Sequence, residues 1–335
     1  MAASELQNRG HTIRFACRYD LICQRARDLD LMSFQFKFLN DLDFHTIYQL
    51  RKYLLKNPVD AIIATKVKEY WLAGWVASML KIPFIIRLGI IRNIPNTLKN
   101  RIIYRKFMDA MIVNSNAIRD NLKRNSIIDL NRVSVVYNGI RCPKTLDDRF
   151  TNPGEKIIIT IGNLSARKNV STLLKIFFKL RNTLPSLKLR LWIIGDGTQR
   201  QELEDLAVHL GISEHVRFWG FRDDIPDLLL KSDVMVLLSH AEGFPNAGLE
   251  AMAWGVPLVI SNFAGVKEFV TDGFSGFIVD PANEEEVVKR INTLVTAEEI
   301  QEKLRRNAFK RMQDQFSLTA MSDHIESVLR SIVNA

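Results

Sequence analysis

Short apolar segments alternate with longer amphipathic segments along almost the whole chain, and this alternation constrains the fold more than any other feature. A strand, a crossover helix and a second strand give a parallel pair, and repeated units of this kind build a sheet with helices on both faces. The sequence therefore predicts an α/β protein made of doubly wound parallel sheets.

The elements of this pattern are read from the spacing of apolar residues. The expected strands span residues 12–17, 33–38, 60–64, 84–88, 110–113, 133–136, 156–161, 188–194, 216–219, 234–238, 257–260 and 276–279. The expected helices span residues 44–55, 68–80, 97–108, 115–124, 170–182, 200–210, 249–254, 284–295, 298–313 and 317–333. Ser115 is the expected N-cap of its helix, because a serine hydroxyl accepts hydrogen bonds from free N–H groups there.

A change of composition near the middle of the chain marks a domain boundary. Residues 142–154 are polar, contain Pro143 and Pro153, and lead into a new apolar segment. The chain has 335 residues, enough for two domains with separate cores. We expect a first domain at residues 1–148, a second at 149–315, and a C-terminal helix at 316–335 that packs back toward the first.

The bulk composition, 47% hydrophobic and 25% charged, is ordinary for a soluble globular protein. Three cysteines, Cys17, Cys23 and Cys142, have no metal-binding or disulfide spacing, which favours reduced thiols. No apolar run approaches the roughly 20 residues that a membrane span requires, and the first ten residues do not resemble a secretory signal. Together these features predict a cytoplasmic protein and weigh against disulfide-rich and membrane-spanning classes.

Positive charge is concentrated in the first half of the chain. Residues 1–150 carry 25 Lys and Arg against 13 Asp and Glu, a net charge of +12, whereas the remainder is at −3. Residues 70–108 contain no acid, and apolar residues separate their bases, which are Lys81, Arg87, Arg92, Lys99, Arg101, Arg105 and Lys106. Such a stretch suits anionic lipid headgroups or a phosphorylated acceptor, although a solvated face is the simpler alternative. Nucleic acid is less favoured, because no recognition motif accompanies the charge.

Two carboxylates, Glu242 and Glu250, stand eight positions apart in a segment that reads as strand, loop and helix. The pattern predicts Glu242 beyond the carboxyl end of a strand and Glu250 in the first turn of a helix. Open α/β sheets bind ligands at that edge, and a helix N-terminus offers free N–H groups to phosphates or sugar oxygens. The segment is therefore a candidate ligand site.

Residues 156–295 resemble the nucleotide-sugar domain of family-4 retaining glycosyltransferases, which have the GT-B fold of two Rossmann-like domains facing a cleft. The segments that carry this resemblance come in the family's order along the chain: residues 162–169, 193–197, 216–221, 239–250, 265–269 and 272–276. The first half matches less closely, through residues 113–115 and 135–139. The resemblance implies a GT-B glycosyltransferase.

The resemblance also implies roles for individual residues. Arg167 and Lys168 would neutralise the diphosphate as it leaves, a form of electrostatic stabilisation. Glu242 would hold the donor sugar or stabilise an oxocarbenium-like state, and Glu250 would accept hydrogen bonds from the ribose. The remaining donor-binding residues implied are Gly162, Asn163, Gly195, Asp196, Gly197, Phe221, Arg222, Gly243, Phe244, Pro245 and Asn246.

Each role has a simpler alternative. Arg167 and Lys168 fit a pair of surface bases at a helix start, and a first-turn Glu250 fits a partner of the helix dipole. Phe221 fits a core aromatic, and Asp196 fits a turn at the end of a strand. The resemblance implies a metal-independent enzyme without a cofactor, and the absence of an Asp-x-Asp-type motif and of histidines at ligand spacing agrees with this expectation.

The expected function is transfer of a sugar, of the hexosyl type, from a nucleotide diphosphate-sugar to a lipid-linked or polysaccharide acceptor. The setting would be cell-envelope glycan synthesis, such as that of lipopolysaccharide, at the inner face of the membrane. The alternative is a non-catalytic, nucleotide-sugar-binding remnant; a GT-B phosphorylase or epimerase is a third possibility and less favoured.

The chain also departs from the family pattern. The phrase at residues 6–11 arrives at once, whereas family members place a strand, a glycine-rich loop and most of a helix before it. We therefore expect the first domain to lack its first strand and loop, which would expose strand edges. The family's histidine after the strand at 84–88 is absent, and Arg87 is its partial substitute; Asn163 stands where arginine is common.

Overall fold

The computed structural model describes residues 2–146 and 154–333, and its contacts divide the chain into two compact units. The first unit joins Met1–Gly139 to the C-terminal segment Leu318–Ala335, and the second unit is Ile140–Ser317. The predicted boundary between residues 148 and 149 lies outside the described residues.

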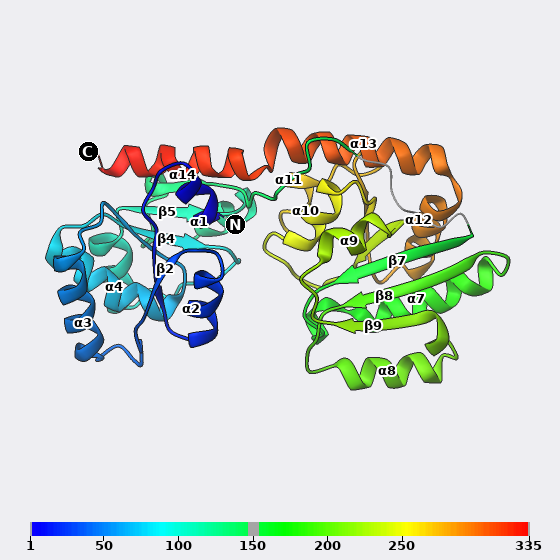
Figure 1. The fold of residues 1–335 in the computed structure, drawn as a ribbon, viewed down its shortest axis with the longest axis horizontal. Helices are drawn as coiled ribbons and strands as arrows, with labels where there is room; N and C mark the ends of the chain where they lie inside the picture. Colours follow the sequence, from blue (N-terminus) through cyan, green and yellow to red (C-terminus); the bar gives the residue numbers. More distant parts are fainter. Residues whose placement is uncertain (1, 147–153, 334–335) are drawn as a thin grey trace. The chain divides into compact units, whose positions relative to one another are not determined.

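The second unit is built on a six-stranded parallel sheet in the order β12-β11-β10-β7-β8-β9 (Figure 1). Its strands are β7 (Glu155–Ile161), β8 (Lys188–Ile194), β9 (Val216–Gly220), β10 (Val234–Leu237), β11 (Leu258–Ser261) and β12 (Phe277–Val279). All four residues of β10 are buried, because helices cover both faces of the sheet.

The helices of the second unit are α7 (Val170–Thr183), α8 (Arg200–His209), α9 (Ile225–Leu230), α10 (Asn246–Ala253), α11 (Val266–Phe269), α12 (Glu284–Thr296) and α13 (Glu298–Gln315). Helices α7, α8 and α12 share one core cluster with Val234 and Val236 of β10. Helix α10 covers the other face, where Gly248 approaches Leu237 and Leu258 closely. The sheet thus holds the start of α10 beside the end of β10.

The first unit has two separate sheets. A four-stranded parallel sheet in the order β3-β4-β5-β6 contains β3 (Ile62–Ala64), β4 (Phe84–Leu88), β5 (Ala110–Val113) and β6 (Val133–Val135). Strands β1 (Arg14–Cys17) and β2 (Met32–Gln35) form a two-stranded parallel sheet. Within residues 2–139 no strand pairing joins the two sheets, whereas the second unit has one continuous sheet.

Helices cover both faces of the four-stranded sheet. The helices of the first unit are α1 (Ala2–Asn8), α2 (Asp20–Arg27), α3 (Phe44–Lys56), α4 (Val67–Leu80), α5 (Leu98–Ile102), α6 (Asn116–Leu122) and α14 (Leu318–Val333). Of these, α2 packs on β1 and β2 of the two-stranded sheet. In β4, Phe84 and Ile86 join the core with α3 and α4, while Ile85 joins the core with α1 and α14. This alternation follows from the two-residue period of a strand.

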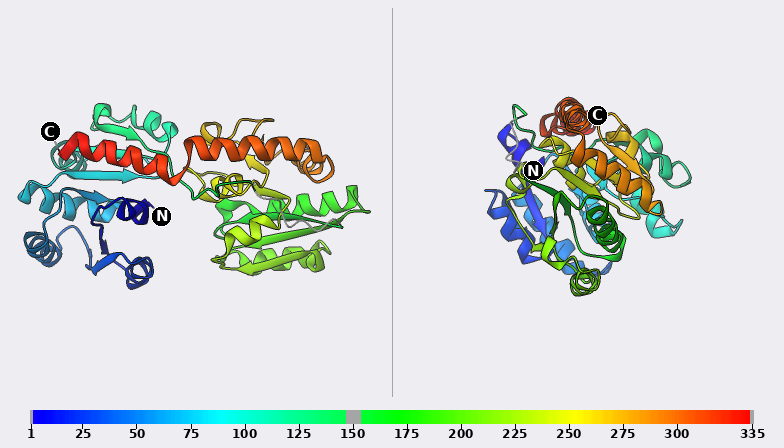
Figure 2. Two further views of the ribbon diagram at one scale, coloured as in Figure 1. Left: turned by 45° about the horizontal axis from the view of Figure 1, so that its top comes forward. Right: turned by 90° about the vertical axis from the view of Figure 1, so that its right-hand side faces the viewer.

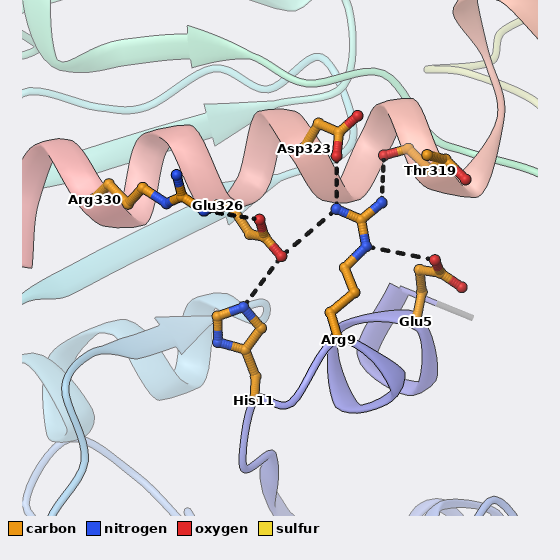
Figure 3. Close-up of polar contacts among 7 residues, drawn as sticks. All are labelled: Glu5, Arg9, His11, Thr319, Asp323, Glu326 and Arg330. Carbon is orange, nitrogen blue, oxygen red and sulfur yellow. Dashed lines mark hydrogen bonds and ion pairs between the residues drawn. The ribbon is translucent and has the colours of Figure 1, made fainter.

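Helix α1 lies beside the C-terminal helix α14 (Figures 1 and 2). Arg9 Nη1 lies 2.6 Å from Asp323 Oδ1 and 3.5 Å from Glu326 Oε1, and His11 Nε2 lies 3.1 Å from that same oxygen of Glu326 (Figure 3). The hydrogen bond from His11 and the charge of Arg9 lower the pKa of Glu326. Polar contacts therefore link the two ends of the chain.

Most predicted elements lie within two or three residues of observed ones, and Ser115 caps α6 by accepting from the N–H of Ile118. Four short α-helices of the described residues were not among the expected elements: α1, α2, α9 and α11. The expected helix at residues 97–108 is α5 followed by the π-helix η1 (Ile103–Phe107). The prediction that Glu250 lies in the first turn of its helix is wrong, because α10 begins at Asn246, three residues before the predicted start.

Candidate functional site

Three loops at the carboxyl ends of β7, β8 and β9 pack backbone against backbone. The N–H of Gly162 donates to the carbonyl of Ile194 (2.9 Å), and the N–H of Gly195 donates to the carbonyl of Gly220 (2.8 Å). A Cβ on Gly195, whose φ is +124°, would lie 2.0 Å from the carbonyl oxygen of Gly162. Only glycine permits this approach, so the sequence at this position fixes the loop geometry.

Arg167, Lys168 and Glu242 form an ionic cluster above these loops. Arg167 and Lys168 belong to the 3-10 turn η3 (Ala166–Lys168) that leads into α7. Arg167 Nη1 lies 2.7 Å from Glu242 Oε2, and Lys168 Nζ lies 2.6 Å from Glu242 Oε1. In the sequence Glu242 lies 75 positions after Arg167 and 74 after Lys168, and the parallel sheet brings them together because β7 and β10 are neighbours.

Main-chain contacts fix the relative position of the two loops. Arg167 Nη1 also donates to the carbonyl of Ala241 (2.7 Å), and the N–H of His240 donates to the carbonyl of Arg167 (2.9 Å). Sequence reasoning did not find the roles of Ala241 and His240, because backbone groups carry them and no side-chain type signals them. The cluster is therefore held by the backbone as well as by charge.

The cluster carries a net positive charge. Burial by itself would raise the pKa of Glu242, but the hydrogen bonds and charges of Lys168 and Arg167 hold that pKa below its usual value. One ionised carboxylate thus faces two cations. The side chain of Arg167 is half exposed while that of Lys168 is largely buried, so the guanidinium presents donors toward solvent. Such an arrangement can bind an anion with more than one negative charge.

Glu250 is a half-buried carboxylate in the second turn of α10. Burial raises its pKa, and among residues 2–146 and 154–333 its carboxylate has no hydrogen-bond or ion-pair partner. A carboxylate is an acceptor with two oxygens, and leaving it unpaired in a partly buried place costs stability. Glu250 is therefore suited to accept hydrogen bonds from a bound hydroxyl-bearing molecule.

The segment between these two carboxylates turns its aromatic side chain inward. Phe244 is 6% exposed, and its ring packs on Phe269 (5.1 Å between centroids) and Phe316 (5.8 Å). Pro245 is the N-cap residue of α10 and Asn246 its first residue. Phe244 and Gly243 therefore offer a ligand only their backbone, which is the contribution that the sequence predicted for this segment.

Of the remaining predicted residues, Phe221 has an exposed side chain, whereas Arg222 and Asp196 bind other residues of the chain. Phe221 is 66% exposed, so the alternative of a core aromatic is wrong. Arg222 instead forms a two-pronged ion pair with Asp224 (2.7 and 2.5 Å). Asp196 accepts from the N–H of Gly197 (2.7 Å) and from Arg200 (3.2 Å), as the alternative of a strand-end turn predicted. Asn163 lies in the loop after β7, beside Gly162.

Arg87 lies in the first unit, on β4. It is largely buried, and Nη2 donates to Asn138 Oδ1 (3.1 Å) and lies 4.0 Å from the sulfur of Met321 in α14. Burial lowers its pKa. Arg87 thus points into the packing beneath α14 and is not part of an exposed basic face, so the expected stretch at residues 81–106 is interrupted.

The described residues offer neither a metal site nor a membrane span. Among residues 2–146 and 154–333, no group of three His, Cys, Asp or Glu side chains lies close enough together to hold a metal ion. In the same residues, no helix is both long and apolar enough to cross a membrane.

Comparison with known proteins places the chain among glycosyltransferases. Residues 144–311 match the family model "Glycosyl transferases group 1", and residues 2–142 match "Glycosyltransferase Family 4". The lipopolysaccharide core biosynthesis glycosyltransferase LpsE of Rhizobium meliloti (strain 1021) is 31% identical over 175 residues, which are 52% of this chain and 50% of that protein. The aligned part spans about half the length of the curated relatives it matches.

Solved structures share the fold over nearly the whole chain. A glycosyltransferase from Rickettsia africae ESF-5 superposes with a TM-score of 0.85 at 18% identity, covering 99% of this chain and 93% of that one. Anabaena Alr3699/HepE, solved in complex with UDP-glucose, superposes with a TM-score of 0.82 at 20% identity, covering 98% and 94%. With one family model matched in each half, the chain belongs to the glycosyltransferases, a family 4 domain followed by a group 1 domain in the GT-B fold.

Proposed function

We propose that the chain transfers a sugar of the hexosyl type from a nucleotide diphosphate-sugar to a lipid-linked or polysaccharide acceptor, with retention of configuration at the anomeric carbon. The ionic cluster of Arg167, Lys168 and Glu242 is the observation that carries the proposal. It combines two cations with one carboxylate at the carboxyl edge of a parallel sheet, where α/β proteins bind nucleotides.

The cluster suits departure of a diphosphate. When the bond from the anomeric carbon to the phosphate oxygen breaks, the electron pair moves to that oxygen, and negative charge develops there. Arg167 and Lys168 stabilise that charge without rearranging, since the backbone already fixes their loop. The acceptor oxygen bonds to the anomeric carbon on the same face and passes its proton to the leaving phosphate, so this route requires no separate base.

The two carboxylates have different parts in this proposal. Glu250, which has a raised pKa and no partner in the described residues, accepts hydrogen bonds from the ribose hydroxyls of the donor. Glu242, which has a lowered pKa, orients the side chains of Arg167 and Lys168 and binds hydroxyls of the donor sugar. Phe221 is exposed at the end of β9 and available to line the base pocket. When the donor binds, its diphosphate replaces part of the contact that Glu242 makes with Arg167 and Lys168.

The proposed reaction needs neither a metal ion nor an organic cofactor, because two fixed side-chain cations meet the charge of the diphosphate. Treatment with EDTA should leave the rate unchanged. A loss of activity that Mg²⁺ or Mn²⁺ restores would contradict this part of the proposal.

The proposed setting is cell-envelope glycan synthesis at the cytoplasmic face of the membrane. Support comes from the similarity to LpsE, whose name assigns it to lipopolysaccharide core biosynthesis, and from the net charge of +12 over residues 1–150. We infer that the first unit makes peripheral contact with anionic lipid through the basic stretch at residues 81–106.

Donor turnover by the purified chain tests the reaction. With UDP- and GDP-sugars as probes, Lys168→Ala should lower the rate of donor hydrolysis or transfer by roughly 10²–10³-fold, the usual cost of removing one donor to a developing oxyanion, and Glu242→Ala should lower it as well. Lys175→Ala is the matched control, because Lys175 is an exposed base farther along α7 and should change nothing.

The alternative of a binding remnant predicts a different pair of results. Calorimetry would detect binding of UDP or GDP, weakened by Lys168→Ala, while no donor is turned over by the unmodified chain. Equal rates for the unmodified chain, Lys168→Ala and Glu242→Ala would reject the assigned roles.

A further inference from the structure

An exposed aromatic face on the first unit has no covering element among the described residues. We define the aromatic face as the exposed side chains of Leu42, Phe44, Tyr48 and Leu98 together with Trp71 and Trp75, which are partly buried and also pack against the core. These residues come from the loop before α3, from α3 and α4, and from the start of α5. Helices α3 and α4 pack side by side (Figure 1), so their outer surfaces adjoin.

The sequence of α4 is apolar on its outer side as well as on its inner side. Tyr70 and Val76 are buried in the core, as expected for a helix packed on a sheet. Trp71, Trp75 and Met79 follow one another at helical spacing on a second stripe, and Met79 is 51% exposed. A helix that is apolar all round is normally covered all round, but Trp71 and Trp75 are covered only in part and Met79 is exposed, so the uncovered part of this stripe is available to a partner.

Ring contacts join the residues at the centre of the aromatic face. The rings of Phe44 and Trp75 lie 6.4 Å apart between centroids, those of Trp71 and Trp75 lie 5.7 Å apart, and Trp71 also contacts Phe107 at 5.7 Å. Tyr48 lies one helical turn from Phe44 on α3, and residues four apart are neighbours on a helix surface. Leu98 immediately precedes Lys99, whose ammonium lies over the ring of Trp71.

Polar contacts hold the aromatic face in an ordered state. Trp71 Nε1 donates to the carbonyl of Asp41 (3.0 Å), and Lys99 Nζ pairs with the carboxylate of that residue (2.5 Å). These contacts tie the loop before α3 to α4 and α5. The most exposed members remain uncovered, with Leu42 at 72%, Phe44 at 60% and Leu98 at 75% exposure.

The charges around the aromatic face favour an anionic partner. The acids of this region are engaged: Asp41 pairs with Lys99, Asp43 caps α3 by accepting from the N–H of Thr46 (2.9 Å), and Glu69 accepts from the N–H of Lys66 (3.1 Å). Bases flank the apolar members on the same elements and are exposed; they are Arg51, Lys52, Lys68, Arg101 and Lys106.

From this combination we infer that the aromatic face docks on an anionic lipid bilayer. Tryptophan and tyrosine favour the interface between headgroups and acyl chains, leucine and phenylalanine insert below it, and surrounding bases attract anionic headgroups. The inference rests on the membrane contact proposed above and gives it a surface. It adds to the basic stretch at residues 81–106 an apolar anchor on α3, α4 and the start of α5.

Vesicle binding tests the inference directly. The purified chain should sediment with vesicles of phosphatidylcholine and phosphatidylglycerol in equal parts at low salt. The triple substitution Leu42→Ser, Phe44→Ser and Leu98→Ser should lower the partition coefficient by at least about tenfold, because it removes most of the inserted apolar surface. Lys68→Gln with Lys106→Gln should weaken binding to these vesicles at low salt and have little effect on vesicles of phosphatidylcholine alone.

A matched control separates this face from general stickiness. The triple substitution Leu21→Ser, Leu29→Ser and Val208→Ser removes equally exposed apolar residues elsewhere on the chain and should leave vesicle binding unchanged. Brominated lipid should quench tryptophan fluorescence of the unmodified chain, and Trp71→Phe with Trp75→Phe should abolish the quenching. Trp192, Trp219 and Trp254 remain in that variant as an internal reference.

Three results would overturn the inference. The first is no retention of the unmodified chain by anionic vesicles. The second is an equal loss of binding by the control triple. The third is a dimer in sedimentation velocity that the Leu42, Phe44 and Leu98 substitutions dissolve, which would make the face a contact between copies. Donor hydrolysis is measured on the same variants, so a failure of docking is distinguished from a failure of the proposed reaction.

Discussion

The two units differ in how their strands are joined. In the second unit the central strand β7 pairs along its two edges with β8 and β10, and the six strands form one sheet. In the first unit β1 and β2 pair with each other alone among the described residues. Where no strand pairing joins β1 to the four-stranded sheet, side chains supply contacts, such as the hydrogen bond from Arg14 Nη1 on β1 to the carbonyl of Pro58 before β3 (3.0 Å).

This difference explains why the loops of the candidate site are more rigid than the side-chain contacts of the first unit. The loops that carry Arg167 and Lys168 lie against their neighbours backbone to backbone, which leaves no rotamer to adjust. Contacts between long side chains, such as those of Arg9 with α14, keep several rotamers within reach. Substitutions in the loops of the second unit should therefore cost more than substitutions at the side-chain contacts of the first unit.

The largest effect is expected from Gly195→Ala. The added Cβ would lie 2.0 Å from the carbonyl oxygen of Gly162 at a φ of +124°, so the two loops must separate. We expect the unfolding free energy of the second unit to fall by at least about 2 kcal/mol and UDP binding to be lost. Calorimetric unfolding and hydrogen exchange measure whether the first unit keeps its stability.

Gly211→Ala is the matched control for this prediction. Gly211 also has a positive φ, +65°, but an added Cβ would meet nothing within 4 Å. The cost should be about 1 kcal/mol, that of the left-handed backbone alone, and UDP binding should persist. Equal effects of the two substitutions would mean that backbone strain, and not the approach of the loops, sets the cost at Gly195.

The sequence predicted the buried strands of both units better than the short helices, for reasons that particular residues make clear. Strands β8, β4 and β5 were predicted to the residue, because buried parallel strands are continuous apolar runs with clear ends. The helix α2 was missed, since its large apolar residues Leu21 and Ile22 are exposed, whereas its buried residues are Cys23 and Ala26. A tertiary setting, and not local periodicity, decides that segment.

In the candidate site, too, some features could be predicted from the sequence and others could not. The pairing of Glu242 with Arg167 and Lys168 depends on the neighbouring positions of β7 and β10, which the parallel pattern makes foreseeable, although the resemblance suggested the residues and not the ion pairs. The burial of Phe244 and the start of α10 at Asn246 were not foreseeable from spacing, because Gly243 and Pro245 obscure where the loop ends. The aromatic face was missed because its members lie in three separate segments.

A smaller effect is expected at Glu250, whose ionised carboxylate lowers the unfolding free energy. Burial raises the pKa of Glu250, so the native state binds a proton more readily than the unfolded state, and ionised Glu250 lowers stability at neutral pH. Glu250→Gln should therefore raise the unfolding free energy at pH 7, by about 1 kcal/mol or less, while weakening UDP binding roughly tenfold through loss of a charged acceptor.

The pH dependence of that gain identifies its cause. As the pH falls through the raised pKa of Glu250, the wild-type carboxyl takes up its proton, and the advantage of Glu250→Gln should disappear. Glu242→Gln should behave in the opposite way, because the lowered pKa of Glu242 contributes stability above its unfolded value of 4.5 that is lost on acidification. Urea unfolding between pH 4 and pH 8 measures both; matching slopes for the two variants would contradict the assignment.

The smallest effect is expected at the side-chain contacts between α1 and α14. Arg9→Gln removes the ion pairs to Asp323 and Glu326, but these pairs are exposed to solvent and screened by salt. Leu6 and Ile325 keep the apolar contact of the two helices, so global stability should barely change, while amide exchange in α1 should rise. Asp323→Asn should raise exchange in α1 to a smaller extent, because it breaks only one of the two ion pairs of Arg9, and the double variant should add little to Arg9→Gln. Exchange that spreads into β4 and β5 would mean that this contact holds the whole first unit together, and the contrast between its side-chain links and the backbone links of the second unit would be weaker than the structure indicates.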